Sequence, residues 1–310
     1  MSKEIPEYNS VLECLQDRYG SLITVTGKSY VGGGDINEAS QLLMSNGDKV
    51  FMKSNSVRNA DFFRAEALGL SAIDATGAIR TPELIGRGID KSGQRAFLIM
   101  EYIGGSKRVA DFWETFGHEL AAMHLAKTTE FTTGYSGNPD ESGRFGFIED
   151  NYIGATKQIN SLRDMWIDFY RECRLMPQFK MADRYFDGGF RSKIDRLLER
   201  LSDYIEEPTR PSLLHGDLWS GNYIIGNDQK AWLIDPAVYV GHAEADLAMT
   251  ELFGRFPERF YSAYSEVNPI SPDYKDRRDL YNLYHLTNHL NLFGPAYLSA
   301  VVETVRYYAG

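Results

Sequence analysis

The chain has 310 residues, 43% of them hydrophobic and 25% charged, which is typical of folded globular proteins and excludes a disordered or membrane-embedded chain. Its formal net charge of −10 argues against a broad surface for nucleic acid or anionic lipid and favours neutral or cationic partners. The two cysteines, Cys14 and Cys173, support neither a disulfide framework nor a multi-cysteine zinc site, and no apolar run resembles a signal core or a membrane span. We therefore expect a cytoplasmic protein, whose oligomeric state the sequence leaves open.

Short β-like runs dominate the first third of the chain. The sequence Asn46-Gly47-Asp48 separates two of them and predicts a hairpin with a positive-φ turn. Apolar residues at helical spacing predict one helix over residues 60–75. The predicted strands lie at residues 22–31, 36–45, 50–53 and 96–102.

After Gly104-Gly105 the pattern becomes mainly helical. A buried helical face is predicted by apolar residues that repeat at intervals of four, four and three, namely Phe112, Phe116, Leu120 and Met123. Further helices are expected over residues 160–176, 189–205, 243–253 and 276–305. We predict an α+β chain of two lobes, a small antiparallel sheet with one helix in residues 1–103 and a larger, mainly helical lobe in residues 104–310.

The strongest chemical signal is HGDLWSGN at residues 215–222, followed by LIDP at 233–236. Phosphoryl transfer requires a group that orients the attacking hydroxyl, together with oxygen ligands that hold Mg²⁺ against the phosphates. Asp217 can act as the base, and Asn222 and Asp235 can bind the metal. The apolar runs between them predict a short hairpin turning at Asn227-Asp228, which would return Asp235 to the neighbourhood of Asn222.

Each of these residues taken alone has an ordinary structural explanation, because Asp, Asn and His often cap helices or build turns. The ordered combination of HGD, an Asn five residues after the Asp, and an apolar strand ending in Asp favours a kinase-like site. We assign His215 to bracing the loop. Asp246, at the start of a predicted helix, is expected to accept backbone N–H bonds that support the loop, and His124 to be a core or bracing histidine.

Longer segments resemble the fructosamine (ketosamine) kinase family. HGDLWSGN with IDPAVYVGHAEADLAM at 234–249 is similar to the catalytic segment of that family. Aminoglycoside phosphotransferases, choline kinases and homoserine kinases share only the HGD…N…D core, so the flanking segments point to ketosamines. Similar stretches cover nearly the whole chain, namely GGGDIN at 32–37, FFRAEALGL at 62–70, FGFIEDNYIGATKQIN at 145–160 and WIDFYRECRLMPQ at 166–178.

The resemblance implies the bilobal protein-kinase-like fold and the use of ATP and Mg²⁺. In that fold Lys53 would reach the α- and β-phosphates, and Glu66 on the following helix would fix its ammonium group. The glycine run would let backbone N–H groups approach phosphate, although such runs are also plain turns. The expected nucleotide contacts are completed by Gly32, Gly33 and Gly34 in this run and by the backbone of Met100, Glu101, Tyr102 and Ile103 at the adenine ring.

The implied reaction transfers the γ-phosphoryl group of ATP to the 3-hydroxyl of a fructosamine or ribulosamine adduct, with a role in deglycation. The substrate is then a small molecule or a glycated amine. Trp219 could lay its ring against the sugar or pack against the lobe. Asp150 and Asn151 could contact sugar hydroxyls or belong to a surface loop.

Two other functions remain open at this stage. An aminoglycoside or other amino-alcohol kinase would share the core motif, although residues 145–160 argue against it. A nucleotide-binding pseudokinase scaffold usually lacks a metal ligand or the base, and here all of these residues are present. The sequence does not distinguish fructosamine, ribulosamine and erythrulosamine, nor free adducts from protein-bound ones.

Overall fold

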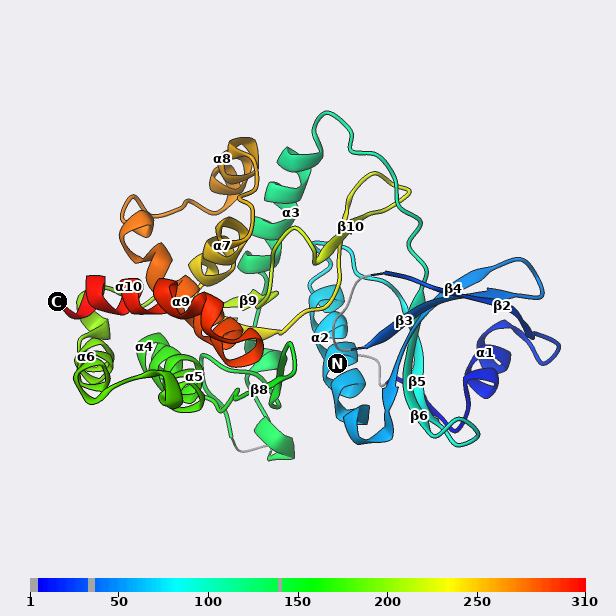
Figure 1. Ribbon diagram of the computed structural model, residues 1–310. Helices are drawn as coiled ribbons and strands as arrows, with labels where there is room; N and C mark the ends of the chain where they lie inside the picture. The colour runs from blue at the N-terminus through cyan, green and yellow to red at the C-terminus, as the bar shows by residue number, and fades with distance from the viewer. Residues whose placement is uncertain (1–4, 33–36, 139–140) are drawn as a thin grey trace. The chain divides into compact units, whose positions relative to one another are not determined.

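The computed structural model describes residues 5–32, 37–138 and 141–310 and confirms the α+β class (Figure 1). The strands are β1 (Glu7–Tyr8), β2 (Val25–Tyr30), β3 (Glu38–Met44), β4 (Lys49–Ser56), β5 (Leu84–Asp90), β6 (Arg95–Glu101), β7 (Asn151–Ile153), β8 (Thr156–Gln158), β9 (Ser212–Leu214), β10 (Tyr223–Ile225), β11 (Ala231–Leu233) and β12 (Tyr239–Gly241). The helices are α1 (Val11–Tyr19), α2 (Ala60–Ala75), α3 (Phe112–Leu125), α4 (Trp166–Phe169), α5 (Met176–Met181), α6 (Gly188–Glu199), α7 (Ala243–Leu252), α8 (Glu258–Val267), α9 (Tyr274–Phe293) and α10 (Leu298–Ala309).

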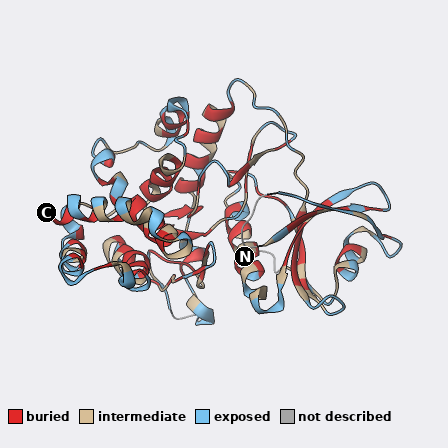
Figure 2. Cartoon of the chain, viewed as in Figure 1, coloured by how far each residue is buried: buried red, intermediate tan, exposed pale blue. Residues whose placement is uncertain are grey.

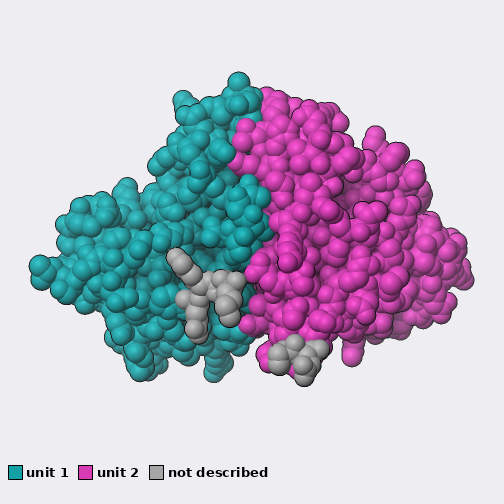
Figure 3. All heavy atoms as spheres, turned by 180° about the vertical axis from the view of Figure 1, so that it is seen from behind, with its two compact units in different colours: residues 1–112, 223–236 teal, residues 113–222, 237–310 magenta. Residues whose placement is uncertain are grey.

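The chain divides into two compact units (Figure 3). The first contains residues 1–112 and 223–236, and the second contains residues 113–222 and 237–310. This division differs from the predicted boundary after residue 103, because the β10–β11 hairpin packs with the first unit. Ser106 N donates to Ile225 O at 2.9 Å, and Leu233 N donates to Arg80 O at 2.8 Å. These backbone hydrogen bonds attach a late segment of the sequence to the early segments at Arg80 and Ser106.

The first unit is built on a six-stranded sheet in the order β1-β5-β6-β4-β3-β2. Side chains alternate between the two faces of a strand. On β4, Val50 and Met52 therefore join the cluster beneath α1, whereas Phe51 packs with the cluster beneath α2. Lys53 has the same parity as Phe51, so the lysine points to the α2 face. Burial of β4 and β6 contrasts with the exposed edge strand β2 (Figure 2).

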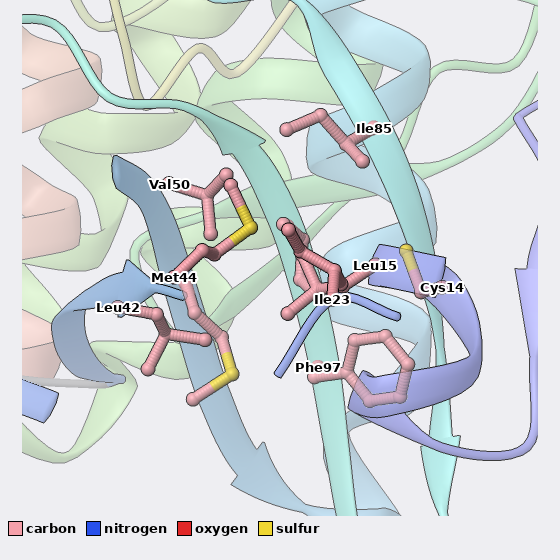
Figure 4. Packing of buried hydrophobic residues seen from close by; sticks show 10 residues of the cluster. Cys14, Leu15, Ile23, Leu42, Met44, Val50, Ile85 and Phe97 are labelled. Carbon is pink, nitrogen blue, oxygen red and sulfur yellow. The ribbon is translucent and has the colours of Figure 1, made fainter. Parts of the chain in front are cut away.

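The cluster on the α1 face holds helix and sheet together (Figure 4). Each of its side chains is at most 6% exposed, so its apolar area is almost completely removed from water. Cys14 belongs to it as a small apolar side chain, and burial raises the pKa of its thiol to about 12. The members are Cys14, Leu15, Ile23, Leu42, Met44, Val50, Met52, Ile85, Phe97 and Ile99.

The predicted hairpin turn at residues 46–48 is confirmed. Gly47 has a φ of 91°, and Asn46 Oδ1 accepts a hydrogen bond from Asp48 N at 3.0 Å. The strand β5 was missed, since its glycines interrupt the alternation that marks a strand. Gly88 is required there, because a Cβ atom would lie 2.0 Å from the carbonyl oxygen of Tyr8 on the parallel strand β1.

The second unit is mainly helical, as predicted, but three predicted helices differ in their bounds, and the helix expected over residues 189–205 ends at Glu199. The helix expected from residue 160 begins at Trp166, where the carboxylate of Glu207 accepts from Trp166 N at 2.8 Å and Ile167 N at 2.9 Å. It continues through a π-helical segment, residues 170–175, into α5. No helix of the described chain has the length and apolar character that crossing a membrane requires.

The single helix expected over residues 276–305 is two helices. Gly294, with a φ of 89°, ends α9, and Pro295 begins the short turn that leads into α10. A left-handed glycine followed by proline is a strong helix stop, because proline cannot donate the next helical hydrogen bond. The helix α9 packs against both α7 and α10 (Figure 1).

Candidate active site

The catalytic loop, residues 215–222, connects β9 to β10. Gly216 has a φ of 79°, and a Cβ atom there would lie 2.0 Å from the carbonyl oxygen of Ala237. The loop can therefore pass the backbone of Ala237 this closely only with glycine at position 216. His215 Nδ1 accepts a hydrogen bond from Asp217 N at 3.2 Å, so this histidine braces the loop as expected.

Asp246 on α7 holds the start of the loop through hydrogen bonds to its backbone. Its Oδ2 accepts from His215 N at 2.7 Å, and its Oδ1 accepts from Gly216 N at 2.9 Å. His124 Nε2 lies 3.2 Å from the same Oδ2, and its Nδ1 lies 2.7 Å from the hydroxyl of Tyr264. Burial alone would raise the pKa of Asp246, but the hydrogen bond from His124 and nearby positive charge lower it below its usual value. The supporting roles predicted for Asp246 and His124 are confirmed.

Replacing Asp246 with alanine should lower the free energy of unfolding by about 3 kcal/mol, because two loop N–H groups and His124 would lose a buried partner. Chemical denaturation at neutral pH measures this change. The matched control is Asp195→Ala on the exposed side of α6, which should change stability by less than about 0.5 kcal/mol. Equal stabilities for the two variants would contradict the role given to Asp246.

Asn222 fixes the carboxylate of Asp217. Its Nδ2 donates to the backbone oxygen of Asp217 at 2.8 Å and to Oδ2 of the same residue at 3.1 Å. The amide nitrogen is thereby used inside the loop, which leaves the amide oxygen as the group suited to a cation. The side chain of Asp217 is 22% exposed, so an acceptor can reach it. The loop thus places the carboxylate of Asp217 and the amide of Asn222 side by side, as the predicted base and metal ligand require.

Lys53 joins two carboxylates within the first unit. Its Nζ donates to Glu66 Oε1 at 2.6 Å and also contacts Asp235 Oδ1. Burial alone would lower the pKa of Lys53, but the charges of Glu66 and Asp235 outweigh it and raise the pKa above its usual value. The ammonium group therefore stays charged and is held where the α2 face of the sheet meets Asp235. This is the ion pair predicted for phosphate binding.

Asp235 has an unusual backbone conformation. It follows β11 with a φ of 54°, in the left-handed region that non-glycine residues seldom adopt. The predicted hairpin is confirmed, with Tyr223 paired to Leu233. Asn222 directly precedes Tyr223, and Asp235 follows Leu233 by two residues, so both leave from the same end of the hairpin. A strained residue held by a strand on one side and proline on the other often marks a functional site.

Asp235 and Asn222, one in each unit, carry oxygen donors of the kind that magnesium binds. Mg²⁺ prefers oxygen ligands and commonly takes one or two from the protein and others from phosphates. Asp235 supplies a carboxylate and Asn222 an amide oxygen. The described residues contain no group of three or more His, Cys, Asp or Glu side chains able to hold a metal alone. The chemistry of these donors therefore fits a cation that arrives with a triphosphate.

The other predicted nucleotide contacts lie at strand ends of the first unit. Gly32 follows β2 in open surroundings, and Gly33 and Gly34 lie outside the described residues. Met100 and Glu101 end β6, and Tyr102 and Ile103 follow it. Glu101 N donates to Glu83 O at 2.8 Å, so this N–H group is used within the sheet. Recognition of adenine by this segment stays a prediction.

Trp219 presents its ring on the second unit. The residue is 36% exposed, and its ring meets that of Phe253 edge-on at 6.3 Å. Gly221 makes room for it, since a Cβ atom at that position would lie 2.4 Å from the indole. Phe253 in turn contacts the ring of His289 on α9 at 4.8 Å. The ring is thus supported from behind and partly open, two residues beyond the base.

Asp150 and Asn151, by contrast, are engaged in contacts within the protein. Asp150 Oδ1 accepts from Tyr135 and from Asn160 N, and its Oδ2 lies 3.2 Å from Lys157. Asn151 is 4% exposed, and its Nδ2 donates to Val238 O at 2.7 Å. Asn151 therefore supports the segment that follows Asp235-Pro236. The sugar contacts predicted for these two residues remain predictions, and their geometry favours support over direct binding.

Two further side chains support or approach these segments: Gln158, which belongs to the family-like stretch at residues 145–160, and His285, which the sequence analysis missed. Gln158 Nε2 donates to Ala237 O at 3.0 Å and to Asn151 Oδ1 at 2.7 Å, so it supports the same segment. His285 on α9 brings its Nδ1 to 4.0 Å from Asp217 Oδ1. No local motif marks His285, because it approaches Asp217 from a distant part of the chain. The helix predicted over residues 276–305 included His285, but the prediction did not say in which direction its side chain points.

Comparison with known proteins agrees with this geometry. The sequence model described as fructosamine kinase matches residues 7–309. A chloroplastic protein-ribulosamine 3-kinase of Arabidopsis thaliana is 40% identical over 293 residues, covering 93% of this chain and 84% of the relative. The crystal structure of a putative fructosamine-3-kinase of Haemophilus somnus is similar with a TM-score of 0.83 and 27% identity, covering 96% of each chain.

A more distant structure extends the fold comparison. An aminoglycoside phosphotransferase in a ternary complex with AMP-PNP and hygromycin B has a TM-score of 0.62 at 16% identity, and the match covers 98% of this chain and all of that one. At this identity the likeness shows the fold alone. The predicted protein-kinase-like fold, which that enzyme shares, is confirmed. The family match spans nearly the whole chain, so the chain belongs to the fructosamine kinase family of ATP-dependent phosphotransferases.

Proposed function

We propose that this protein transfers the γ-phosphoryl group of ATP to the 3-hydroxyl of a ketosamine, a sugar joined to an amine. One observation carries the proposal: Asn222 Nδ2 holds Asp217 through two hydrogen bonds, at 2.8 and 3.1 Å, inside the loop of a fructosamine kinase family member. A carboxylate fixed in this way and still exposed is suited to orient a hydroxyl.

Four side chains support the proposed binding of Mg-ATP. Lys53, held by Glu66, would bind the phosphates, and Asp235 with Asn222 would hold Mg²⁺. When bound, Mg²⁺ neutralises phosphate charge. ATP binding displaces the present contact between Lys53 and Asp235, because each of these groups then has a new partner of opposite charge.

The proposed reaction is a direct in-line transfer. The oxygen of the 3-hydroxyl bonds to the γ-phosphorus, the bond from that phosphorus to the bridging oxygen of ADP breaks, and the hydroxyl proton passes to Asp217. No covalent intermediate with the enzyme forms. Asp217 returns the proton to solvent after the products leave, so the carboxylate is regenerated for the next turnover.

Trp219 is proposed as the platform for the sugar. Its ring is 36% exposed and supported by Phe253. Trp219→Ala should raise the KM for the ketosamine about tenfold, which corresponds to the loss of about 1.4 kcal/mol of stacking, with a smaller change in kcat. Trp219→Phe is the matched control, since it keeps a ring, and its KM should stay within about threefold of the wild-type value. Steady-state kinetics would disprove the platform if the alanine variant bound the ketosamine as well as the phenylalanine variant does.

The function itself is tested with a panel of acceptors. The purified protein is incubated with radiolabelled Mg-ATP and fructosyl-lysine, ribulosyl-lysine, choline or kanamycin, and transfer of label is measured. We expect label on one or both ketosamines and none without Mg²⁺. Label on kanamycin or choline alone would identify an amino-alcohol kinase, and ATP binding without any transfer would identify a pseudokinase.

We propose deglycation in a reducing compartment such as the cytoplasm as the cellular role. Cys14 and Cys173 are both buried free thiols, which suits a reducing environment. Phosphorylation at the 3-position would destabilise the adduct and release the amine. The panel also compares fructosyl with ribulosyl acceptors, and a glycated protein added to it compares free with protein-bound adducts.

A further inference from the structure

His285 is a buried side chain with an unused polar atom next to the catalytic base. The side chain is 5% exposed, and among the described residues its Nδ1 has no hydrogen-bond partner. Buried polar atoms are nearly always paired, because leaving one unpaired costs free energy. The nearest charged group is Asp217 Oδ1 at 4.0 Å, a separation too long for a hydrogen bond. Such an atom indicates a partner that is gained in another state of the enzyme.

Neighbouring polar groups are already used. The hydroxyl of Tyr284 donates to Gln158 Oε1 at 2.7 Å, and His289 Nδ1 bonds the backbone oxygen of His285 at 2.8 Å. Because Nδ1 itself is buried, a substrate cannot reach it directly. A movement of Asp217 by about 1 Å would bring the two atoms to hydrogen-bond distance. Asp217 is therefore the partner that the geometry offers.

The helix that carries His285 is well anchored, whereas Asp217 lies on a loop. The guanidinium group of Arg277 on α9 makes two hydrogen bonds to Glu244, at 2.6 and 2.7 Å. The hydroxyl of Tyr170 donates to the backbone oxygens of Leu280 and Tyr281, each at 2.9 Å. These contacts anchor the part of α9 that precedes His285. The distance between His285 Nδ1 and Asp217 Oδ1 would therefore shorten by movement of the loop that carries Asp217.

We propose that His285 is a positioning residue, whose Nδ1–H donates to Asp217 Oδ1 when the acceptor binds and thereby aims the carboxylate at the acceptor hydroxyl. This role rests on the proposed function. Asn222 already holds Oδ2 at 3.1 Å, so the two donors would fix both oxygens and hence the plane of the carboxylate. Each carboxylate oxygen has a second lone pair, so one remains for the hydroxyl proton.

A neutral imidazole suits this role. Burial, with a smaller effect from His289, lowers the pKa of His285 to about 3, so the ring carries no charge near neutral pH. A neutral donor orients Asp217 without the charge that would make the carboxylate a much weaker base. It also adds no positive charge near the cationic amine of a ketosamine.

The test uses side chains that place a donor at different positions. In His285→Asn the amide nitrogen takes the place of Nδ1, in His285→Gln it extends toward the place of Nε2, and His285→Leu has no donor. We expect kcat for the ketosamine to fall about 100-fold in the leucine and glutamine variants, and to stay within about fivefold in the asparagine variant. The KM for ATP should be unchanged in all three.

Thermal unfolding of each variant separates positioning from folding. If His285→Leu loses its cooperative transition, the asparagine and glutamine variants test the positioning role instead. Both carry an amide, and they differ only in the length of the side chain. Wild-type kcat in His285→Leu, or equal losses in the asparagine and glutamine variants, would overturn the positioning role alone. A wild-type protein inactive on every ketosamine would overturn the proposed function, and the role of His285 with it.

Discussion

Replacing Asp217 with asparagine should reduce kcat for the ketosamine by about 10³-fold or more, because an amide cannot take the proton of the attacking hydroxyl. Asparagine has nearly the same shape, and its Oδ1 can still accept the hydrogen bond from Asn222 that now reaches Asp217 Oδ2 at 3.1 Å. The loop should therefore keep its structure, and the affinity for Mg-ATP should change little. Radiolabel transfer measures kcat, and calorimetric titration with a non-hydrolysable ATP analogue measures nucleotide binding.

The matched control is Asp164→Asn, which removes the same charge from an exposed position of the second unit. Its kcat should equal that of the wild-type protein. Undiminished transfer by Asp217→Asn would refute the assignment of the base. A fall in kcat accompanied by loss of nucleotide binding would instead indicate a damaged loop, and unfolding curves for the two variants would show it.

The residues that the sequence predicted best are those fixed by local patterns. Strand alternation sets the side to which Lys53 points, and a helix begun at residue 60 carries Glu66 to it. The hairpin over residues 223–233 pairs its last residue with its first, so Asp235 follows at the end of the hairpin where Asn222 enters. In each case a repeat of two or 3.6 residues, or a turn of defined length, determines the geometry. Once such a pattern is recognised, it leaves few possible positions for the side chain.

The residues that could not be predicted depend on distant contacts. Asp150 and Asn151 looked like polar loop residues, yet Asn151 is buried, because Val238, 87 positions later, offers it a carbonyl oxygen. His285 lies 68 positions from Asp217, and only the direction of α9 brings them near each other. The split of the last predicted helix at Gly294-Pro295 had a local signal that the helical periodicity obscured. Sequence patterns thus predicted His215, Asp246 and His124 as supports of the loop, but not the contacts of Asn151 or His285, which depend on how distant segments pack.

Lys53 and Asp235, which are both predicted to bind parts of Mg-ATP, contact each other in this structure. The two groups have opposite charges and contact each other, so the buried ammonium group of Lys53 has two carboxylate partners, Glu66 and Asp235. Asp235 also keeps a left-handed backbone, at a φ of 54°, although that conformation costs free energy for most residues. Function accounts for both features more simply than stability does.

Asp235→Asn should therefore reduce kcat/KM for Mg-ATP by about 100-fold or more, because the site loses the carboxylate that would bind the cation. Asparagine tolerates the left-handed conformation better than other non-glycine residues, so the backbone should be preserved. Asp235→Ala is the informative comparison, since it loses the same ligand and should in addition lower the free energy of unfolding by about 1 kcal/mol through strain.

The two effects are separated by titrating activity with Mg²⁺ and by measuring unfolding. In both variants half-maximal activity should require a higher Mg²⁺ concentration than in the wild-type protein, whereas only the alanine variant should show the strain. A Mg²⁺ titration unchanged in Asp235→Asn would remove Asp235 from the metal site. Asp228→Asn is unsuitable as a control, because Asp228 pairs with Arg80 at 2.6 Å and accepts from the indole of Trp232. Asp164→Asn, with its exposed side chain, serves here as well, and its Mg²⁺ requirement should match that of the wild-type protein.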